Sequence, residues 1–391
     1  MTPEDDSMTD HDNSELPSGS HRRPGTLQTL GQAPAAHAIG VHQNPAKPVR
    51  KLNRRLTNMR MLTVALVFPL FMILVMPLVM TGMGHDLHPR HMDVAVIGTG
   101  QQIQDQTDQL DESSLDRFDV HRVDSVDEAK DQVRDHTIRA AYDPADAKLY
   151  LAGANGRQVT QAVTELFRPV AQQAGMSLST EDLQELKSSD SNGTSAAYLA
   201  LGAALGGYMT GMILGLVPTR SAWRILFGIA MPALIATCEV LYGWAVFGIF
   251  DGSSAMPWLM LFLLGLSCTA VMLGGMLVLG VVMIPLGVLA MPLLGMSASG
   301  AVMPLDMMNP FYPWVHPWLF SAQGLAAVKD AIYFQDASLA QPVWVMLAWL
   351  AGGIALAVWG TVHQKRRHLF GMLDERERTE AVVAAAAAAA P

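Results

Sequence analysis

The stretch that decides the fold is WLMLFLLGLSCTAVMLGGMLVLGVVMIPLGVLAMPLLGMSASGAVM, residues 258–303, which contains not one charged side chain. The hydrocarbon core of a bilayer is about 30 Å thick, so one helical crossing needs about 20 apolar residues. Lipid offers the backbone no hydrogen-bond partner, so a spanning segment must be helical or part of a closed barrel. The apolar residues run continuously instead of alternating, which favours helices. We therefore expect an α-helical polytopic membrane protein.

Apolar runs and basic clusters together predict six transmembrane helices. The runs cover residues 61–80, 196–217, 225–250, two crossings within 258–296 that join near 274–280, and 342–362. Basic residues cluster at 50–60, 220–224 and 365–367. Loops with an excess of Lys and Arg stay in the cytoplasm. The sequence therefore predicts a multi-pass protein of the cell (plasma) membrane with both termini in the cytoplasm.

Composition divides the chain into five segments. Residues 1–49 are rich in Ser, Pro, His, Gly and acids. Such a segment buries too little apolar surface to offset its ordering entropy, so we expect a disordered cytoplasmic tail. Four further segments are expected: a basic interfacial stretch with the first transmembrane helix, an extracytoplasmic α/β domain, a five-helix transmembrane domain and a second cytoplasmic tail. They cover residues 50–82, 83–194, 195–364 (with an outer loop at 299–341) and 365–391.

The segment between the first and second crossings has an α/β pattern. Residues 82–194 carry 20 Asp and Glu against 10 Lys and Arg, so the domain is acidic. Ser125 and Glu128 have the spacing of a capping box, so a helix is expected to begin there. Gly98-Thr99-Gly100 lacks the third glycine of a phosphate-binding loop, so we interpret it as a turn. Strands are expected at 92–97, 118–123, 137–142 and 148–152, and further helices at 101–115 and 156–174.

Two stretches, together with this layout, are similar to a known family. They are DVAVI (93–97) followed by FDVHRVDSVDEAKDQVRDHTIRAAYDP (118–144), and SGAVMPLDMMNPFYPWVHPWLFSAQGLAAVKDAI (299–332). The chain resembles the type-2 ABC transporter permeases (ABC-2 type membrane proteins), in particular the phage infection protein-like branch. The resemblance implies a role for Asp306 in the loop before the last crossing. It also implies that Lys329 takes the place of the positive residue that precedes that crossing in the family.

The resemblance further implies a cytoplasmic contact with a separate ATPase through Arg220 and Arg224. The alternative is that these residues only obey the positive-inside rule and bind anionic lipid head groups. No G-x-x-x-x-G-K-[ST] sequence occurs in the chain, so any nucleotide energy would come from another protein.

Glu239 is the acidic residue near the middle of the third predicted crossing. A carboxylate at that depth is costly unless it is protonated, paired or facing a wet cavity, so it is a candidate transport residue. The alternative is a protonated carboxyl group that bonds Thr237 or Tyr242 and serves packing alone.

Three glycines in the second predicted crossing share one helix face. Gly207, Gly211 and Gly215 stand four residues apart, and such a stripe lets two helix backbones approach closely in lipid. We expect helix packing within the chain here, with a dimer seam as the alternative. Prolines and aromatic residues in the outer loop indicate short interfacial or re-entrant helices.

The sequence offers little for enzyme chemistry. His85, His88 and His91 could bind zinc by their spacing, but a juxtamembrane linker without a carboxylate is the favoured interpretation, so no metal is expected. No Ser-His-Asp or paired-carboxylate pattern occurs, and we predict neither an enzyme nor a cofactor. Cys238 and Cys268 both lie in apolar runs.

The resulting hypothesis is an export permease for an amphipathic or lipid-like substrate, with energy from a separate ATPase or an unknown source. Membrane lipids, a cytoplasmic ABC ATPase and a second copy or a relative (a homodimer or heterodimer) are the expected partners, and no nucleic acid is. The alternative is a non-transporting surface protein whose outside domain binds a partner or phage. A membrane enzyme acting on lipid or wall precursors is a third possibility.

Overall fold

The computed structural model describes residues 68–84, 87–186, 188–190, 192–250, 253–334 and 336–388, without the side chains of 365–378 and 382–388. These residues are mostly helical. The expected disordered tail at 1–49, the basic cluster at 50–60 and the start of the first apolar run lie outside the described residues. The described part of that run belongs to an apolar helix at Phe68–Gly84.

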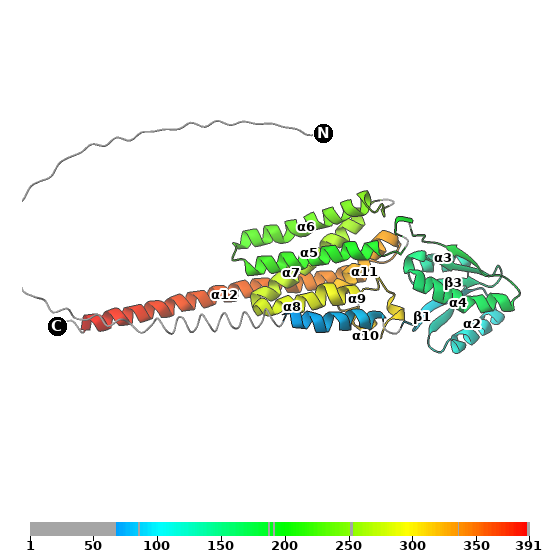
Figure 1. Ribbon diagram of the computed structural model, residues 1–391, viewed down its shortest axis with the longest axis horizontal. Helices are drawn as coiled ribbons and strands as arrows, with labels where there is room; N and C mark the ends of the chain where they lie inside the picture. Colours follow the sequence, from blue (N-terminus) through cyan, green and yellow to red (C-terminus); the bar gives the residue numbers. More distant parts are fainter. Residues whose placement is uncertain are drawn as a thin grey trace, which may run out of the picture. The chain divides into compact units, whose positions relative to one another are not determined.

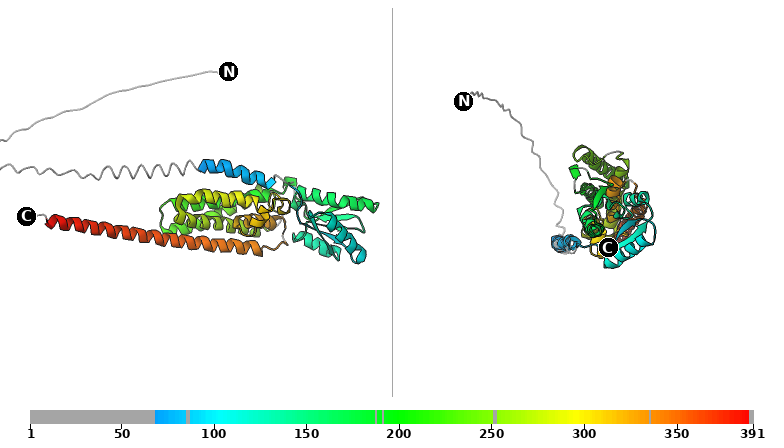
Figure 2. Two further views of the ribbon diagram at one scale, coloured as in Figure 1. Left: turned by 90° about the horizontal axis from the view of Figure 1, so that it is seen from below. Right: turned by 90° about the vertical axis from the view of Figure 1, so that its right-hand side faces the viewer.

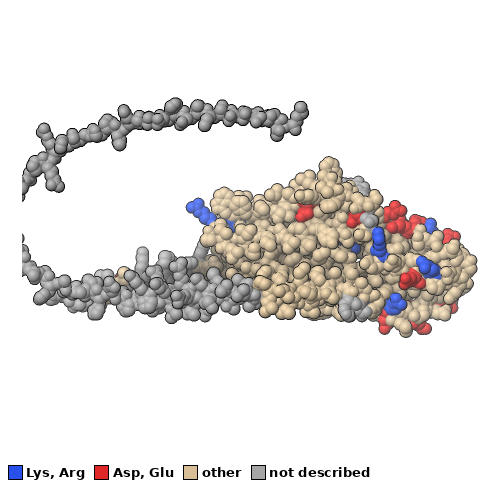
Figure 3. Space-filling model, viewed as in Figure 1, with Lys and Arg blue, Asp and Glu red and all other residues tan. Residues whose placement is uncertain are grey.

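Four described helices are long and apolar enough to cross a membrane. Two of them are α5 (Ser195–Leu216) and α6 (Ser221–Ala245). The third begins with α7 (Ala255–Leu279), and the fourth is the first part of α12 (Ala340–Ala388), apolar over Ala340–Gln364. The helices pack side by side (Figure 1). On the face shown in Figure 3, charged side chains gather over the α/β domain, and the described surface of the helices is almost free of them.

The apolar stretch Ala255–Ser297 contains a reversal of the chain. After α7, Gly280 adopts a φ of +63°, a left-handed conformation that favours glycine. An added Cβ on Gly287 would lie 2.8 Å from Met272 Sδ, so the residues that follow Gly280 return along α7. The chain therefore reverses at Gly280, the last residue of the junction predicted at 274–280. The returning segment consists of α8 (Met283–Val288), the π-helical η4 (Leu289–Leu293) and α9 (Leu294–Ser297).

α7 is the central helix of the bundle. It contacts α5, α6, α11 (Phe320–Tyr333) and α12, and its buried side chains include Leu261, Leu264 and Met272. In contrast, only 17% of an 18-residue apolar stretch is buried in α6, and the same share is buried in the crossing part of α12. The described residues therefore leave apolar faces of these two helices uncovered.

The α/β domain is built on a five-stranded sheet of order β2-β1-β3-β4-β5. β1 pairs in parallel with β2 and β3, β3 pairs antiparallel with β4, and β4 pairs in parallel with β5. The strands are β1 (Met92–Ile97), β2 (Phe118–Val123), β3 (Ala140–Asp143), β4 (Lys148–Leu151) and β5 (Ser179–Asp182). The predictions of β1 and β2 are confirmed residue for residue.

Helices cover both faces of the sheet. The cores show that α2 (Gln101–Ser113) and α4 (Arg157–Gln173) pack on one face, and α3 (Val126–Arg134) packs on the other. Ser125 accepts a hydrogen bond from the Glu128 backbone N–H, which confirms the predicted start of α3. Phe334, which directly follows α11, is 1% exposed and belongs to the core on the α3 face. The helical bundle thus contributes a side chain to the core of the α/β domain.

Two larger details of the sheet differ from the sequence prediction, while the other predicted strand ends agree to within one residue. β3 begins at Ala140 and not at residue 137, because the backbone N–H groups of Thr137 and Ile138 both donate to Gln132 O at the end of α3. β5 was not predicted. Its sequence, STED, is polar and lacks the apolar alternation by which a strand is recognised.

The predicted outer loop contains three short helical elements: η5 (Leu305–Met307), α10 (Phe311–Val315) and α11. α11 packs against α5, α7 and α12, and nine of its residues are buried. The backbone of α12 continues as a helix to Ala388, through the predicted tail from residue 365 (Figure 2).

Candidate functional site

An ion pair joins the α/β domain to the loop before α11. Arg139, next to β3, donates from Nε to Asp306 Oδ2 of η5 over 2.7 Å. Its Nη1 also donates to Asn155 Oδ1 at 3.2 Å and to His136 Nε2. The two partners are only 20% and 13% exposed, so the pair is largely shielded from water. Arg139 and Asp306 stand 167 residues apart in the chain.

His136 extends this contact to α11. Its ring stacks on Phe334 with centroids 4.2 Å apart and planes 2° apart, and its Nδ1 lies 3.5 Å from Asp330 Oδ1. Because an arginine can only donate, His136 Nε2 must accept the bond from Arg139, so the ring is neutral with its proton on Nδ1. Protonation of Nε2 would place two N–H donors opposite each other.

A second contact connects the end of α11 to the start of α5. The Tyr333 hydroxyl donates to Asp190 Oδ2. Asp190 Oδ1 accepts from the backbone N–H groups of Thr194 and Ser195, which open α5. The chain entering the bundle and the short helix α11 are therefore tied to the same carboxylate.

Lys329 is buried within this cluster. Its side chain is 6% exposed, and Nζ donates to Gly300 O over 3.3 Å. Burial and, to a smaller extent, the positive charge of Arg139 lower the pKa of Lys329 to about 8, against the opposing effect of Asp330 and Asp306. The structure thus brings together Asp306 and Lys329, the two residues implied by the family resemblance.

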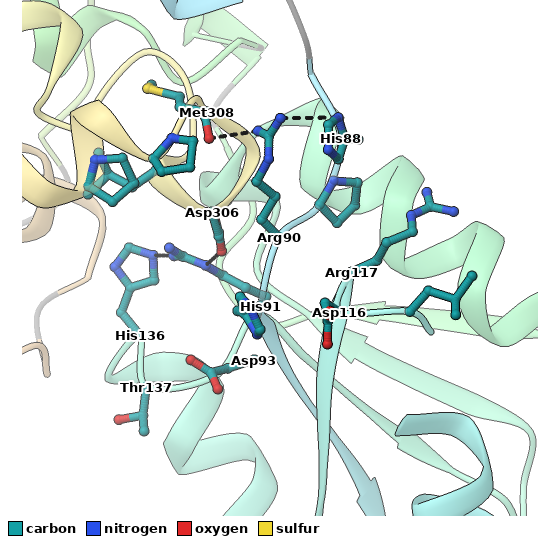
Figure 4. A pocket seen from close by; sticks show the side chains of 16 residues that line it. His88, Arg90, His91, Asp93, Asp116, Arg117, His136, Thr137, Asp306 and Met308 are labelled. Atoms are coloured by element: carbon teal, nitrogen blue, oxygen red, sulfur yellow. Dashed lines mark hydrogen bonds and ion pairs between the residues drawn. The ribbon is translucent and has the colours of Figure 1, made fainter. Parts of the chain in front are cut away.

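Two cavities flank the cluster. The outer cavity has a volume of about 700 Å³. Figure 4 shows Arg90 on its wall, where Nη1 donates to Met308 O over 2.7 Å, with His88 and His91 nearby. The inner cavity has a volume of about 200 Å³. Both are lined by His136, Arg139 and Leu305.

Glu239 lies away from this cluster, in α6. Its half-buried carboxyl group packs on Gly202 of α5, where an added Cβ would collide with Oε1. Within the described part of the chain, no hydrogen bond joins Glu239 to Thr237 or Tyr242, the two partners weighed above. Thr237 instead donates to Ala233 O and accepts from Trp258 Nε1.

The predicted glycine stripe packs against α7. An added Cβ on Gly207 would collide with Gly265 O, and one on Gly211 would lie 2.5 Å from Thr269 O. On Gly215 it would lie 2.5 Å from Met276 Cβ. Arg220 is exposed at the start of α6, and Arg224 follows one turn later. Neither arginine lines a cavity described above.

The described residues include only part of the predicted histidine series. His85 lies outside them, and His91 forms an ion pair with Asp119 at 2.9 Å. No group of three or more His, Cys, Asp or Glu side chains suited to a metal ion occurs in the part of the chain that the structure describes.

The functional residues missed by sequence reasoning are His136, Arg139, Asn155 and Asp330. Their spacing in the sequence does not indicate a common site, because they come from separate elements. Only Asp330 could have been suspected, since it directly follows Lys329. No protein-family model, no curated protein and no solved structure matches this chain.

We expect acid to weaken the fold through His136. Burial is the main cause that lowers the pKa of His136 below its ordinary 6.5, followed by the charge of Arg139. The unfolded chain then takes up a proton before the folded one does. The stability contributed by neutral His136 is therefore present above pH 6.5 and is lost as the pH falls below that value.

Thermal melts of purified protein between pH 7.5 and pH 5 would measure this effect. His136→Gln keeps an acceptor for Arg139 and should show a smaller loss of melting temperature on acidification than wild type. His121→Gln, at an exposed position, is the matched control and should behave as wild type. Equal acid sensitivity in all three proteins would contradict the prediction.

Proposed function

We propose that this protein is an export permease of the ABC-2 type in the plasma membrane, with six crossings and an extracytoplasmic α/β domain. The four long apolar helices support membrane insertion. In the six-span arrangement, the helix Phe68–Gly84 extends the first crossing, and the segment from α8 to α9 is the fifth. The substrate is amphipathic or lipid-like, since the helices offer few charges.

The observation that carries the proposal is the buried connection between the α/β domain and α11. A domain tethered only for surface binding needs no ion pair shielded from water. Here Arg139 bonds Asp306, and Phe334 packs inside the domain while α11 packs among α5, α7 and α12. A rearrangement of the bundle would therefore be transmitted to the domain, as an alternating transport cycle requires.

Two copies, or one copy and a relative, would form the pathway between them. The apolar faces of α6 and α12 that the described residues leave uncovered provide surfaces for this arrangement. Energy would come from a separate ATPase that contacts Arg220 and Arg224. A pull-down from native membrane that captures an ATPase would support this partnership.

Impermeant thiol labelling tests the topology. In a chain with Cys238 replaced by Ala, we expect Gln102→Cys in α2 to react on intact cells and Ser221→Cys in α6 to react only after lysis. Both positions are exposed. The opposite pattern would overturn the permease proposal. Unchanged efflux in a deletion strain that loses a surface-binding phenotype would favour the surface-protein alternative.

Glu239→Gln should reduce export and leave expression intact. The substitution keeps the size of the side chain but removes its ability to ionise. The carboxyl group of Glu239 has no described hydrogen bond, so ionisation is the property that the variant tests. Glu165→Gln, on the exposed side of α4, is the matched control and should export normally. Efflux of Glu239→Gln equal to that of wild type would remove Glu239 from the mechanism.

A further inference from the structure

Two side chains at the inner cavity carry hydrogen-bond donors that have no partner among the described residues. Lys329 has three N–H groups and donates one of them to Gly300 O. Asn155 is 3% exposed, and its Nδ2 is buried without a hydrogen-bond partner among the described residues. Both side chains line the cavity of about 200 Å³ together with Arg139. Burying unused donors is costly, so this surplus indicates a ligand rich in acceptors.

Lys329 is the charged side chain at the inner cavity that lacks a close counter-ion among the described residues. Arg139 is paired with Asp306, and Asp330, which also lines the cavity, lies 3.5 Å from His136 Nδ1. No described carboxylate lies within 4 Å of Lys329 Nζ, so its ammonium group has no close counter-ion in the described chain. An isolated buried charge is strongly unfavourable unless a partner of opposite sign is bound.

The outer cavity adjoins the inner one and offers a place for an apolar part of this ligand. It shares His136, Arg139 and Leu305 with the inner cavity. Its wall also carries Met308, Pro310 and Pro313, which suit apolar groups.

We propose that the inner cavity binds a phosphate-class oxyanion through Lys329 Nζ, Asn155 Nδ2 and the guanidinium of Arg139. The oxyanion is either free phosphate or the phosphate of a lipid whose apolar part lies in the outer cavity. The oxyanion site stands on the cavity and its donors alone; only the further step, that the bound phosphate lipid is the exported substrate, rests on the proposed function.

Calorimetry on full-length protein in a phosphate-free maltoside detergent tests the site. The probes are inorganic phosphate, short-chain phosphatidic acid and, as a control without phosphate, diacylglycerol of the same chain length. Bound phosphorus in the purified protein is measured first, so that a lipid retained from the membrane is detected. Binding of phosphatidic acid alone would identify a lipid source, whereas equal binding of inorganic phosphate would identify the free ion.

Two substitutions locate the binding. Lys329→Gln removes the ammonium group, and Asn155→Asp keeps the acceptor for Arg139 while replacing the unused donor with a carboxylate oxygen. Each should weaken binding, or the retention of phosphorus, by about tenfold or more. Lys148→Gln, which removes a lysine paired with Glu181 outside the cavity, should bind as wild type. If Lys329→Gln fails to fold, Asn155→Asp decides the matter.

Wild-type protein that contains no phosphorus and binds none of the phosphate probes would overturn the proposal. Binding that both cavity substitutions leave unchanged would overturn it as well. These outcomes do not depend on transport. A protein that binds phosphate but is inserted with the opposite topology would refute the proposed function alone.

Discussion

Gly211→Leu should abolish assembly of the helical bundle. α5 and α7 approach so closely at this position that a Cβ on Gly211 would lie 2.5 Å from Thr269 O and 2.8 Å from Met272 Cβ. Backbone atoms of a packed helix cannot move aside as a flexible side-chain tip can, and one extra methyl group in a tight core already costs about 1–3 kcal/mol. A leucine adds three further carbons at the same contact.

Fluorescence-detected size exclusion of detergent extracts would measure the loss of folded protein. Gly211→Ala should lower the melting temperature, and Gly211→Leu should give aggregate only. Gly352→Ala is the matched control, because an added Cβ on Gly352 in α12 meets no atom within 4 Å. A Gly211→Leu chain that elutes and melts like wild type would contradict the packing of α5 on α7.

Arg139→Met alone should destabilise the connection between the α/β domain and the bundle by about 3 kcal/mol. Removing one member of a largely buried ion pair leaves the other charge without compensation, and such losses are typically about 3–5 kcal/mol. Asp306 is 13% exposed, and its Oδ1 already lacks a partner among the described residues, so the loss of Arg139 would leave a shielded carboxylate.

A double-mutant cycle separates this effect from a simple loss of packing. Asp306→Leu alone should also destabilise the protein, whereas the double variant Arg139→Met/Asp306→Leu should recover much of the stability, because two apolar side chains can replace a buried pair. Thermal melts in detergent and limited proteolysis between β5 and α5 would measure both. Additive losses in the double variant would show that the two residues are not coupled.

The parts of the fold that depend on local pattern could be predicted from the sequence. Alternating residues specify β1 and β2, and continuous apolar residues specify α5, α6 and α7. The capping pair Ser125 and Glu128 specifies the start of α3. Each of these signals lies within a few residues of the element that it describes.

The candidate site could be predicted only in part, because it is made by contacts between distant segments. Family resemblance pointed to Asp306 and Lys329, but nothing near them in the chain indicates Arg139 or His136. Prolines and aromatic residues predicted short helices in the outer loop, but they gave no sign that α11 is largely buried, with Gln323 and Ser321 beside its apolar residues. The sequence likewise does not distinguish Phe334 from the other aromatic residues of the loop, although its side chain lies in the core of the α/β domain.

The length of α12 has a mechanical consequence. With a rise of about 1.5 Å per residue, the helix extends roughly 36 Å beyond residue 364, past the apolar stretch that would lie in lipid. A continuous rod of this kind works as a lever arm. A tilt of about 10° in its lipid-embedded part would carry the far end through roughly 6 Å, so a small repacking against α7 would become a displacement large enough for a neighbouring molecule to sense.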